Sequence, residues 1–394
     1  MKAERRVVTL GEVATVQSGF AFKSSQWTKT GVPVVKIANV KSGRIDLTSN
    51  QSFVSESDAE KAARFRLQHG DIVIGMTGYV GEVAQVRSND HLLLNQRVGL
   101  IQIDESKADR QYLFHLMNGE GFRSQAKALA YGSAQPNISP SLLHSIEIEL
   151  PSIDEQRTIA ATLGALDDKI ESNRRQRHLL RELGIARYQA SIRDGSRSLQ
   201  LSAATVSIAR GVAPKYADED LDAALVINQK CIRDGWVSLA PARRMHDRTV
   251  KPEKRASAGD ILVNSTGTGT LGRIARWHAG EIFVDGHVSV VKADRSVISP
   301  TVLAYSLLGR EADIEGLATG STGQTELSAA RLGELNVILP PTEQGSRLET
   351  TLIAIENRCD QLAAENTNLE STRDALLPAL LSGSIRVPAE GVEA

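Results

Sequence analysis

The sequence predicts an α+β protein in which two β-rich mixed domains are separated by a pair of long antiparallel coiled-coil helices, in a pseudo-two-fold internal repeat. Three observations predict this class. A short segment recurs at a fixed offset, stretches with strand-like alternation give way twice to a helical pattern, and each helical pattern carries a long apolar seam.

The internal repeat is the first of these observations. The segment GDIVIGMTG, from Gly70 to Gly78, recurs later in the chain as GDILVNSTG, from Gly259 to Gly267. The same shift in residue number aligns four further matches, namely Gln135 with Gln324, Leu143 with Leu332, Ile148 with Val337, and Leu150-Pro151 with Leu339-Pro340. Because several matches in one register are much harder to obtain by accident than one, the chain contains two copies of one unit.

Each copy begins with a globular domain and ends with a helix. Apolar stretches such as residues 32–40, 71–76 and 285–293 alternate with Gly- and Ser-containing turns, which is typical of strands. The predicted boundaries are 1–150 for the first domain, 151–195 for a central helix, 196–340 for the second domain, and 341–394 for a C-terminal helix and tail.

Both helices have recognisable N-terminal signals. Ser152 and Glu155 have the spacing of a capping box. Thr342 precedes Glu343 and Gln344, as an N-cap does when acidic or amide residues fill the first turn. We therefore expect each helix to begin directly after a Leu-Pro pair.

An apolar seam with steps of three and four residues runs along each helix. In the first helix it consists of Ile159, Leu163, Leu166, Ile170, Asn173, Arg177 and Leu180. The shift that relates the two copies converts this series to Leu348, Leu352, Ile355, Cys359, Leu362, Asn366 and Leu369. The alternative is that each helix packs separately on its own domain. A stripe of roughly 40 residues makes a helix of about 60 Å, which is longer than one small domain covers, so the other helix is the expected partner.

Chain connectivity favours antiparallel packing of these helices. If they ran parallel, the second domain, which joins the end of the first helix to the start of the second, would have to span their full length. Antiparallel packing removes that requirement and places the two domains at opposite ends of the pair.

Bulk composition sets limits on the function. The formal charge of -1 gives no global attraction to nucleic acid, so any DNA contact must come from local basic surfaces. The two cysteines, Cys231 and Cys359, are far apart and have no metal-ligand spacing, so we expect both to be structural. The N-terminus carries charges where a signal peptide needs an apolar run, and no run of 18 apolar residues occurs. We therefore expect a soluble, cytoplasmic protein.

Two related domains at a fixed separation suit a ligand that repeats along a line, and DNA repeats about every 34 Å. Residues 228–256 carry eight Lys or Arg against three acids, and residues 23–46 of the first copy carry five against one. Loops rich in small hydroxyl and amide residues also recur in both copies, at 77–79 and 132–135, and at 265–270 and 321–324. Such loops can contact phosphates and base edges.

One motif suggests a different class of protein. Gly267, Gly269 and Gly272 fit the GxGxxG pattern, which would make the chain a standalone nucleotide-dependent oxidoreductase or methyltransferase. The residues that follow look like a strand and a turn, whereas a dinucleotide site needs a long helix there. The eight histidines have no metal-ligand spacing. We therefore predict no catalytic residues and no metal site in this chain. A structural tether whose domains bind protein is a further alternative.

The repeated GDI(V/L)(I/V)…TG segment, the Gly-Ser-x-Gln type of loop, and the helix entries IELPSIDEQ and VILPPTEQ resemble the specificity subunit of type I restriction-modification systems. The segment NSTGTGTLGR, residues 264–273, is similar to one found in such domains. The resemblance covers nearly the whole chain, in the order domain, helix, domain, helix.

This resemblance implies a non-catalytic protein that recognises DNA within a methyltransferase and endonuclease complex. Each domain would be a target-recognition domain that reads one half of a bipartite, asymmetric double-stranded DNA sequence. The helices would set the length of the unread spacer and dock two methyltransferase subunits. Restriction and motor subunits would join them. This chain would bind no cofactor itself, while S-adenosylmethionine, ATP and Mg would be held by the partner subunits.

Basic, amide, hydroxyl and aromatic residues in the recurring loops and basic stretches are the candidates for DNA contact. In the first domain these are Lys36, Asn39, Lys41, Arg44, Tyr79, Arg97, Ser133 and Gln135. In the second they are Lys230, Arg233, Arg243, Arg244, Thr268, Thr270, Arg273 and Gln324.

Overall fold

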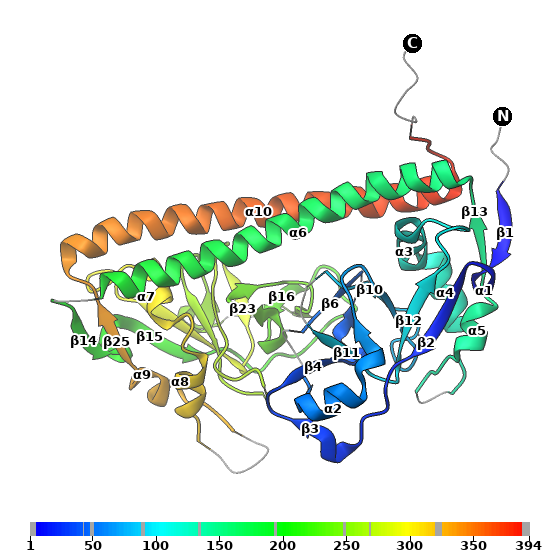
Figure 1. The fold of residues 1–394 in the computed structure, drawn as a ribbon. Coiled ribbons are helices and arrows are strands. Elements are labelled where there is room, and N and C mark those ends of the chain that lie inside the picture. Colours follow the sequence, from blue (N-terminus) through cyan, green and yellow to red (C-terminus); the bar gives the residue numbers. More distant parts are fainter. Residues whose placement is uncertain are drawn as a thin grey trace. The chain divides into compact units, whose positions relative to one another are not determined.

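A computed structural model describes residues 5–41, 43–47, 51–87, 91–132, 135–192, 195–246, 250–267, 269–319 and 325–387. The chain divides into two units. The first unit is Met1–Ser172 together with Glu365–Ala394, and the second is Asn173–Ala364. Each unit therefore contains one β-rich domain and about half of each of two long helices, α6 (Ile153–Ser191) and α10 (Thr342–Ser382) (Figure 1).

The described residues of the first unit's domain form three sheets. The largest has the strand order β2 (Ala14–Ser18), β12 (Val98–Ile103), β9 (Ile72–Gly75), β10 (Val83–Gln85), β6 (Gly43–Ile45) and β5 (Val40–Lys41). The second has the order β3 (Trp27–Thr28), β7 (Phe53–Val54), β4 (Val32–Val35), β11 (Leu92–Leu94) and β8 (Arg66–Leu67). A ribbon of β1 (Arg6–Thr9) and β13 (Glu147–Leu150) closes the domain, because the first and last strands of the domain pair with each other.

The domain of the second unit repeats this plan with shorter sheets. One sheet has the order β15 (Thr205–Arg210), β24 (Val288–Ala293), β21 (Ile261–Asn264) and β22 (Ile274–Arg276). Another has the order β19 (Arg243–Met245), β16 (Ala224–Ile227), β23 (Ile282–Val284) and β20 (Arg255–Ala256). Two ribbons complete it, β14 (Arg197–Gln200) with β25 (Asn336–Leu339) and β17 (Ile232–Arg233) with β18 (Trp236–Val237).

The strand orders show that the repeat in the sequence is a repeat in topology. The order β2-β12-β9-β10 of the first unit corresponds to β15-β24-β21-β22 of the second. The glycine that opens each recurring GDI segment has the same role in both, since Gly70 (φ +88°) and Gly259 (φ +97°) adopt the left-handed conformation just before the central strand. A side chain there would be strained, which explains why glycine recurs at this point.

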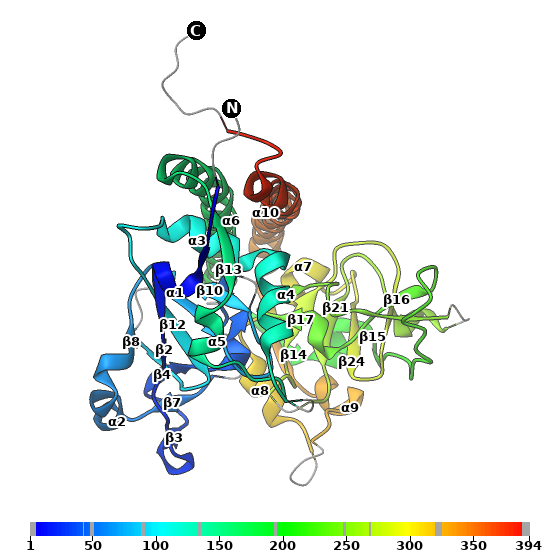
Figure 2. The ribbon, with the colours of Figure 1, turned by 90° about the vertical axis from the view of Figure 1, so that its right-hand side faces the viewer.

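Short helices cover the sheets. In the first unit they are α1 (Leu10–Val13), α2 (Glu56–Lys61), α3 (Arg110–Asn118), α4 (Glu120–Leu129) and α5 (Pro140–His144). In the second they are α7 (Pro300–Leu307), α8 (Glu311–Gly316) and α9 (Ala329–Gly333). Single 3-10 turns lie at Ser24–Gln26, Ile37–Asn39, Ala63–Phe65, Leu201–Ala204, Gln229–Cys231 and Pro252–Lys254. Figures 1 and 2 both show α3 lying between α6 and strands β10 and β12.

The two long helices pair with each other in antiparallel fashion within each unit. In the first unit, Asn366 Nδ2 donates to the carbonyl of Ile170 (3.2 Å), and Arg373 Nη1 lies 2.9 Å from Asp167 Oδ1. In the second, Cys359 Sγ lies 3.9 Å from the carbonyl oxygen of Arg177. As the residue number rises along α10, the number of its partner in α6 falls. The prediction of antiparallel packing is therefore confirmed for these contacts.

Most of the predicted seam is buried, with Leu166, Arg177, Leu180 and Leu369 partly exposed, and the seam packs on the domains as well as between the helices. Ile159 and Leu163 of α6 belong to the core of the first domain, and Leu352 and Ile355 of α10 belong to that of the second. Asn173 is fully buried. The sequence leaves two alternatives, pairing of the long helices with each other and packing of each helix on its own domain. The structure contains both.

The predicted N-cap is confirmed for the first long helix and lies one residue away from the observed N-cap in the second. Ser152 is confirmed as a cap, because its Oγ accepts a hydrogen bond from the Glu155 amide (3.3 Å) just before α6 begins. Thr342 was predicted as the cap of the second helix, but α10 already includes it, and the Gly345 amide bonds to the carbonyl of Pro341 (2.8 Å). Pro341 therefore occupies the position expected for Thr342. Among the described residues, no helix combines the length and the apolar character needed to cross a membrane.

The GxGxxG motif lies in a hairpin and not at the start of a helix. The described part of the segment turns from β21 into the antiparallel strand β22, with Gly267, Gly269 and Gly272 all in the left-handed region. The Gly272 amide bonds back to the carbonyl of Asn264 (2.9 Å). A hairpin loop of this kind has no helix N-terminus to hold a pyrophosphate, as the sequence predicts.

A buried histidine makes the stability of the first unit sensitive to acid. His115 in α3 is 3% exposed, and burial lowers its pKa from 6.5 to about 4, although the carboxylate of Asp167, 3.9 Å from Nδ1, acts in the opposite direction. The unfolded state therefore binds more protons than the folded state between these two values. Stability is fully present above the unfolded pKa and is lost as the pH falls toward about 4, by roughly 3 kcal/mol.

Urea unfolding at pH 7.5 and pH 5 would measure this loss. His115→Gln has no imidazole to protonate, so we expect its stability to change less between the two pH values than that of the wild type. An equal change in both proteins would contradict the assignment to His115.

Candidate nucleic-acid interface

Three loops of the first unit meet at one end of strand β9. The loop that follows β9 runs beside residues 135–138, because the Gly78 amide bonds to the carbonyl of Pro136 (2.8 Å) and the Ile138 amide bonds to that of Met76 (2.9 Å). The turn before β12 joins them through the Met76 amide and the carbonyl of Arg97 (3.1 Å). Two loops predicted from the sequence as recurring polar loops, together with this turn, therefore form one continuous surface.

Polar side chains of these loops are linked in a chain. Thr77 Oγ1 donates to Asn137 Oδ1 (2.8 Å), and Asn137 Nδ2 donates to Tyr131 Oη (2.8 Å). The amides and carbonyls of Tyr131 and Asn137 also bond to each other (2.9 and 2.8 Å). These contacts link the described parts of the loops to one another, so the surface is held in place by its own hydrogen bonds.

Large side chains project from this frame into solvent. Tyr79 is 63% exposed and Tyr131 is 56% exposed, and Arg97 and Gln135 are exposed as well. Among the described residues, no carboxylate lies within ion-pair distance of the Arg97 guanidinium. Exposed aromatic, guanidinium and amide groups on a single surface are suited to contact with phosphates and base edges.

The second unit builds the same frame from corresponding residues. The Ser265 amide bonds to the carbonyl of His287 (2.9 Å), as Met76 does to Arg97, and the Leu327 amide bonds to the carbonyl of Ser265 (2.9 Å), as Ile138 does to Met76. Thr319 and Glu326 bond to each other in both directions (3.0 Å each), as Tyr131 and Asn137 do. These backbone contacts of the loops are therefore repeated in the second unit.

The side chains carried by these matching loop backbones differ between the two units. Where the first unit has Arg97, the second has His287, whose Nδ1 lies 2.7 Å from Thr266 Oγ1. Where the first unit has Asn137, the second has Glu326, which forms an ion pair with Arg210 of β15. Two identical scaffolds with different chemistry would bind two different surfaces of a ligand.

The predicted contact residues of the first domain divide into several groups. Tyr79, Arg97 and Gln135 lie on the loop surface, Arg44 is exposed in β6, and Ser133 lies outside the described residues. Lys36 and Lys41 are partly committed to their own domain. The first lies over the Trp27 ring (4.9 Å) and bonds to Ser52 Oγ (3.2 Å), and the second pairs with Asp46 (2.9 Å).

The prediction for Asn39 is wrong. This residue is fully buried, its Oδ1 accepts from the Lys36 amide (2.9 Å), and its Nδ2 donates to the carbonyl of Asp46 (2.9 Å). Cys231 holds the corresponding position in the second unit, where its Sγ lies 3.5 Å from the Asn228 amide. Both residues brace a 3-10 turn from the inside, so neither is available to DNA in this conformation.

In the second unit, Lys230, Thr270 and Arg273 are brought together around a buried asparagine. Asn264 Nδ2 donates to the carbonyls of Gln229 and Thr270 (3.0 Å each), and Arg273 Nη2 donates to that of Gly269 (3.0 Å). Lys230 is exposed beside this turn. Thr268 and Gln324 lie outside the described residues.

The other predicted arginines of the second unit are tied to their own sheet. Arg243 pairs with Asp218 (2.5 Å) and stacks over the Tyr216 ring (3.2 Å), while Arg244 Nη1 donates to the carbonyl of Ala223 (2.7 Å). Arg233 is half-buried in β17. Much of the basic character of residues 228–256 therefore stabilises the domain.

Sequence reasoning missed several residues of the loop surface, namely Tyr131, Asn137, Thr266, His287 and Glu326. Thr266 lies in a recurring polar loop but was not chosen as a contact residue, and the other four lie outside the recurring loops and basic stretches. The signal that identifies them is the contrast between the repeats. Asn137 and Glu326 differ although they occupy matching positions of the two copies, in the register that aligns Leu143 with Leu332.

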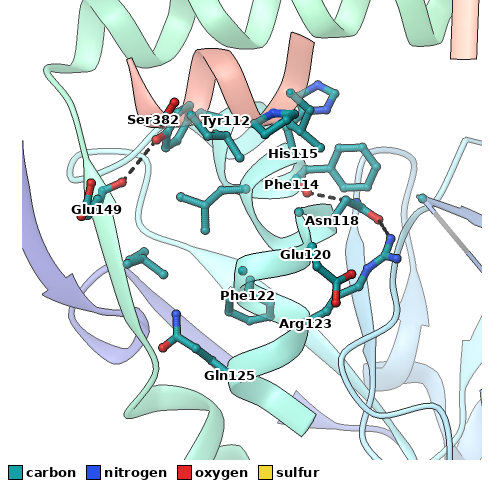
Figure 3. A pocket seen from close by; sticks show the side chains of 18 of the residues that line it. Tyr112, Phe114, His115, Asn118, Glu120, Phe122, Arg123, Gln125, Glu149 and Ser382 are labelled. Carbon is teal, nitrogen blue, oxygen red and sulfur yellow. Dashed lines mark hydrogen bonds between the residues drawn. The ribbon is translucent and has the colours of Figure 1, made fainter. Parts of the chain in front are cut away.

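A cavity of about 1040 Å³ in the first unit is a second candidate site (Figure 3). Apolar side chains such as Tyr112, Phe114 and Phe122 line it, and its charged residues are five acids, Glu120, Glu147, Glu149, Asp167 and Asp374, against two arginines, Arg123 and Arg373. Such an excess of carboxylates repels phosphate, so this cavity does not fit DNA.

Comparisons with known proteins find DNA specificity domains of restriction enzymes. The family described as type I restriction modification DNA specificity domain matches residues 3–181. The MjaVIII specificity subunit of a type I restriction enzyme from Methanocaldococcus jannaschii is 35% identical over 176 residues, which are 43% of this chain and 41% of the relative. Residues 3–181 of the chain are therefore similar to the DNA specificity domains of type I restriction-modification systems.

Another specificity subunit matches over a greater length. The putative MjaX specificity subunit of the same organism is 22% identical over 405 residues, covering 94% of this chain and 91% of the relative. The match to MjaVIII spans less than half of that relative. The crystal structure of the type I S subunit from M. genitalium, at 16% identity and a TM-score of 0.53, covers 96% of both chains and shows the fold alone.

Proposed function

We propose that this chain is the DNA-binding specificity subunit of a type I restriction-modification complex, in which each domain reads one half of a bipartite, asymmetric target. The observation that carries the proposal is the repeated loop frame. The same backbone contacts hold Arg97, Asn137 and Tyr131 in the first unit, and His287, Glu326 and Thr319 in the second. Direct readout of bases depends on side-chain chemistry, so different side chains on equal frames select different half-sites.

The long helices would set the unread spacer between the half-sites. In each unit, α6 and α10 are joined by hydrogen bonds and also belong to the domain core. A domain that packs against both helices is held at a defined position along the axis of the helix pair. The pseudo-two-fold relation between the units belongs to the same proposal.

The chemistry would belong to the partners. Two methyltransferase subunits docked on the helices would supply S-adenosylmethionine, and restriction and motor subunits would supply ATP and Mg. This chain's own contribution would be non-catalytic, namely binding and orientation of cytoplasmic double-stranded DNA. The names of the family's members, which are specificity subunits of restriction enzymes, support this division of labour.

Exchange of the second domain tests the proposal. Residues 196–340 would be replaced with those of a relative, the chimera would be co-expressed with its methyltransferase subunits, and methylated sites would be mapped across the host genome. We expect one half-site to change and the other to stay the same. A target altered in both halves would show that the domains do not read independently, and methylation without sequence preference would support a tether.

A further inference from the structure

Each unit buries one carboxylate at a matched position of the two long helices. The shift that aligns Gly70 with Gly259 also aligns Asp167 of α6 with Glu356 of α10. Their side chains are 11% and 3% exposed. Burial of a charge on a helix that also packs apolar side chains is costly, so each carboxylate must be compensated by its surroundings.

In the second unit the compensation comes from several elements at once. Tyr305 of α7 donates its hydroxyl to Glu356 Oε1 (2.5 Å), and His278 Nε2, just after β22, lies 3.0 Å from Oε2. Arg181 of α6 and Arg276 of β22 each approach the carboxylate to 3.9 Å. Glu356 therefore contacts the sheet, the covering helix and the other long helix.

Arg181 extends this network to a further strand pair. Its Nη1 donates to the carbonyl of Gly235 (2.9 Å), between β17 and β18, and its guanidinium lies 3.7 Å from the centre of the Trp236 ring. Burial raises the pKa of the Glu356 carboxyl, but hydrogen bonds from His278 and Tyr305 and the charge of Arg181 more than offset it, to about 2. The carboxylate is therefore charged under all ordinary conditions.

The first unit has the same arrangement with different side chains. Arg373 of α10 lies 2.9 Å from Asp167, Arg87, just after β10, lies 3.7 Å from it, and His115 Nδ1 of α3 lies 3.9 Å from it. In the strand pairing Arg87 corresponds to His278, because the Val86 and Trp277 amides bond in the same way to the carbonyls of Asp71 and Asp260. His115 and Tyr305 stand at equal distances along the chain from the N-caps of their helices, Asp109 and Ser299.

In both units, then, a carboxylate on one long helix contacts an arginine from the sheet and an arginine from the other long helix. A helix pair with a purely apolar seam tolerates a small shift of a domain along it, because one leucine can take the place of another in the contact. A buried ion pair does not, since a slip leaves a charge without its partner at a large cost. This is the physical basis on which buried polar groups fix register in coiled coils.

We propose that Asp167 and Glu356 are positioning residues that fix the height at which each recognition domain sits on the helix pair, and thereby set the length of the DNA spacer. This inference rests on the proposed function. The carboxylates are buried beneath the domains, so they act through the placement of the recognition loops and not by touching DNA.

Glu356→Gln and Asp167→Asn test the proposal, since both keep the shape of the side chain and remove its charge. Each variant would be co-expressed with the methyltransferase subunits, and methylated genomic sites would be sorted by spacer length. We expect the share of sites whose spacer is one base pair too long or too short to rise by about tenfold, the effect of losing one coupled buried contact. Both half-site sequences should stay unchanged.

Matched variants separate charge from general damage. Glu356→Asp and Asp167→Glu exchange the residues that the two units use, and we expect both to keep the narrow spacer. Glu343→Gln removes a carboxylate of α10 that is 84% exposed, and it should change nothing. If Glu356→Gln does not accumulate as folded protein, Arg276→Gln removes the sheet side of the same contact and carries the test.

If Glu356→Gln and Asp167→Asn both kept the single spacer length of the wild type, the positioning role would be overturned. The same holds for Arg276→Gln where it is used in place of Glu356→Gln. That result is distinct from failure of the proposed function, which would appear in the wild type as methylation without a bipartite target.

Discussion

Replacing Tyr79, Arg97 and Gln135 together with alanine is expected to lower the affinity of the assembled complex for its cognate DNA by about a thousandfold. Specific base contacts contribute roughly 1–3 kcal/mol each, and the loss of three on one surface removes most of the discrimination by that domain. All three side chains are exposed on the loop frame of the first unit, so their removal leaves the core intact. Fluorescence anisotropy with a labelled duplex would measure the change.

The salt dependence separates two kinds of contact in this experiment. If Arg97 contacts a phosphate, Arg97→Ala alone should reduce the slope of log affinity against log salt by about one, whereas Tyr79→Ala should leave the slope unchanged. Arg347→Ala, at an 82% exposed position of α10, removes the same charge away from the loops and should have little effect. A triple variant that binds within fivefold of the wild type would rule out this surface as the reading face.

Removal of the Glu356 carboxylate is expected to have the largest effect on stability. Glu356→Ala leaves Arg181, Arg276 and His278 without their shared partner, and Arg181 is only 7% exposed at its side chain. Breaking a buried ion pair from one side costs about 3–5 kcal/mol, and the partial exposure of Arg276 and His278 places the expected loss near the lower end, about 3 kcal/mol. Urea unfolding of the full chain would measure it.

Two variants control for other consequences of that change. Tyr305→Phe removes one hydrogen bond to the same carboxylate and keeps the ring, so we expect a smaller loss, of about 1 kcal/mol. Glu343→Ala, in the exposed first turn of α10, should leave the unfolding curve unchanged. Equal stability of Glu356→Ala and the wild type would mean that the surrounding cations are compensated in another way.

The loop surface shows how far residue types alone can identify a site. Arg97, Tyr79 and Gln135 could be proposed because exposed loop residues with those side chains are common DNA contacts. Arg243, Arg244 and Asn39 have equally suitable side chains, but the fold directs them to Asp218, to a backbone carbonyl and to the domain interior. The sequence can identify a basic or amide residue as a candidate for DNA contact. The residues that it contacts in the folded chain determine whether its side chain is available to DNA.

Helix α10 shows a similar limit for local rules. Pro378 lies inside the helix, where a proline removes one backbone hydrogen bond and would by itself favour termination. The helix nevertheless continues to Ser382, because Leu376, Leu377 and Leu380 on this last stretch pack against the core of the first domain. Tertiary packing outweighs the local preference here.

The order of residues was enough to predict the repeat, the division into β-rich domains and long helices, the antiparallel pairing and the similarity to type I specificity subunits. These features rest on periodicity and chain connectivity, which can be read along a single chain. The sequence did not predict which polar side chains contact one another, and only the tertiary structure shows these contacts. The three loops on one surface, the buried Asn39 and the carboxylates Asp167 and Glu356 all depend on contacts between residues far apart in the chain, and spacing along a sequence does not encode such distances.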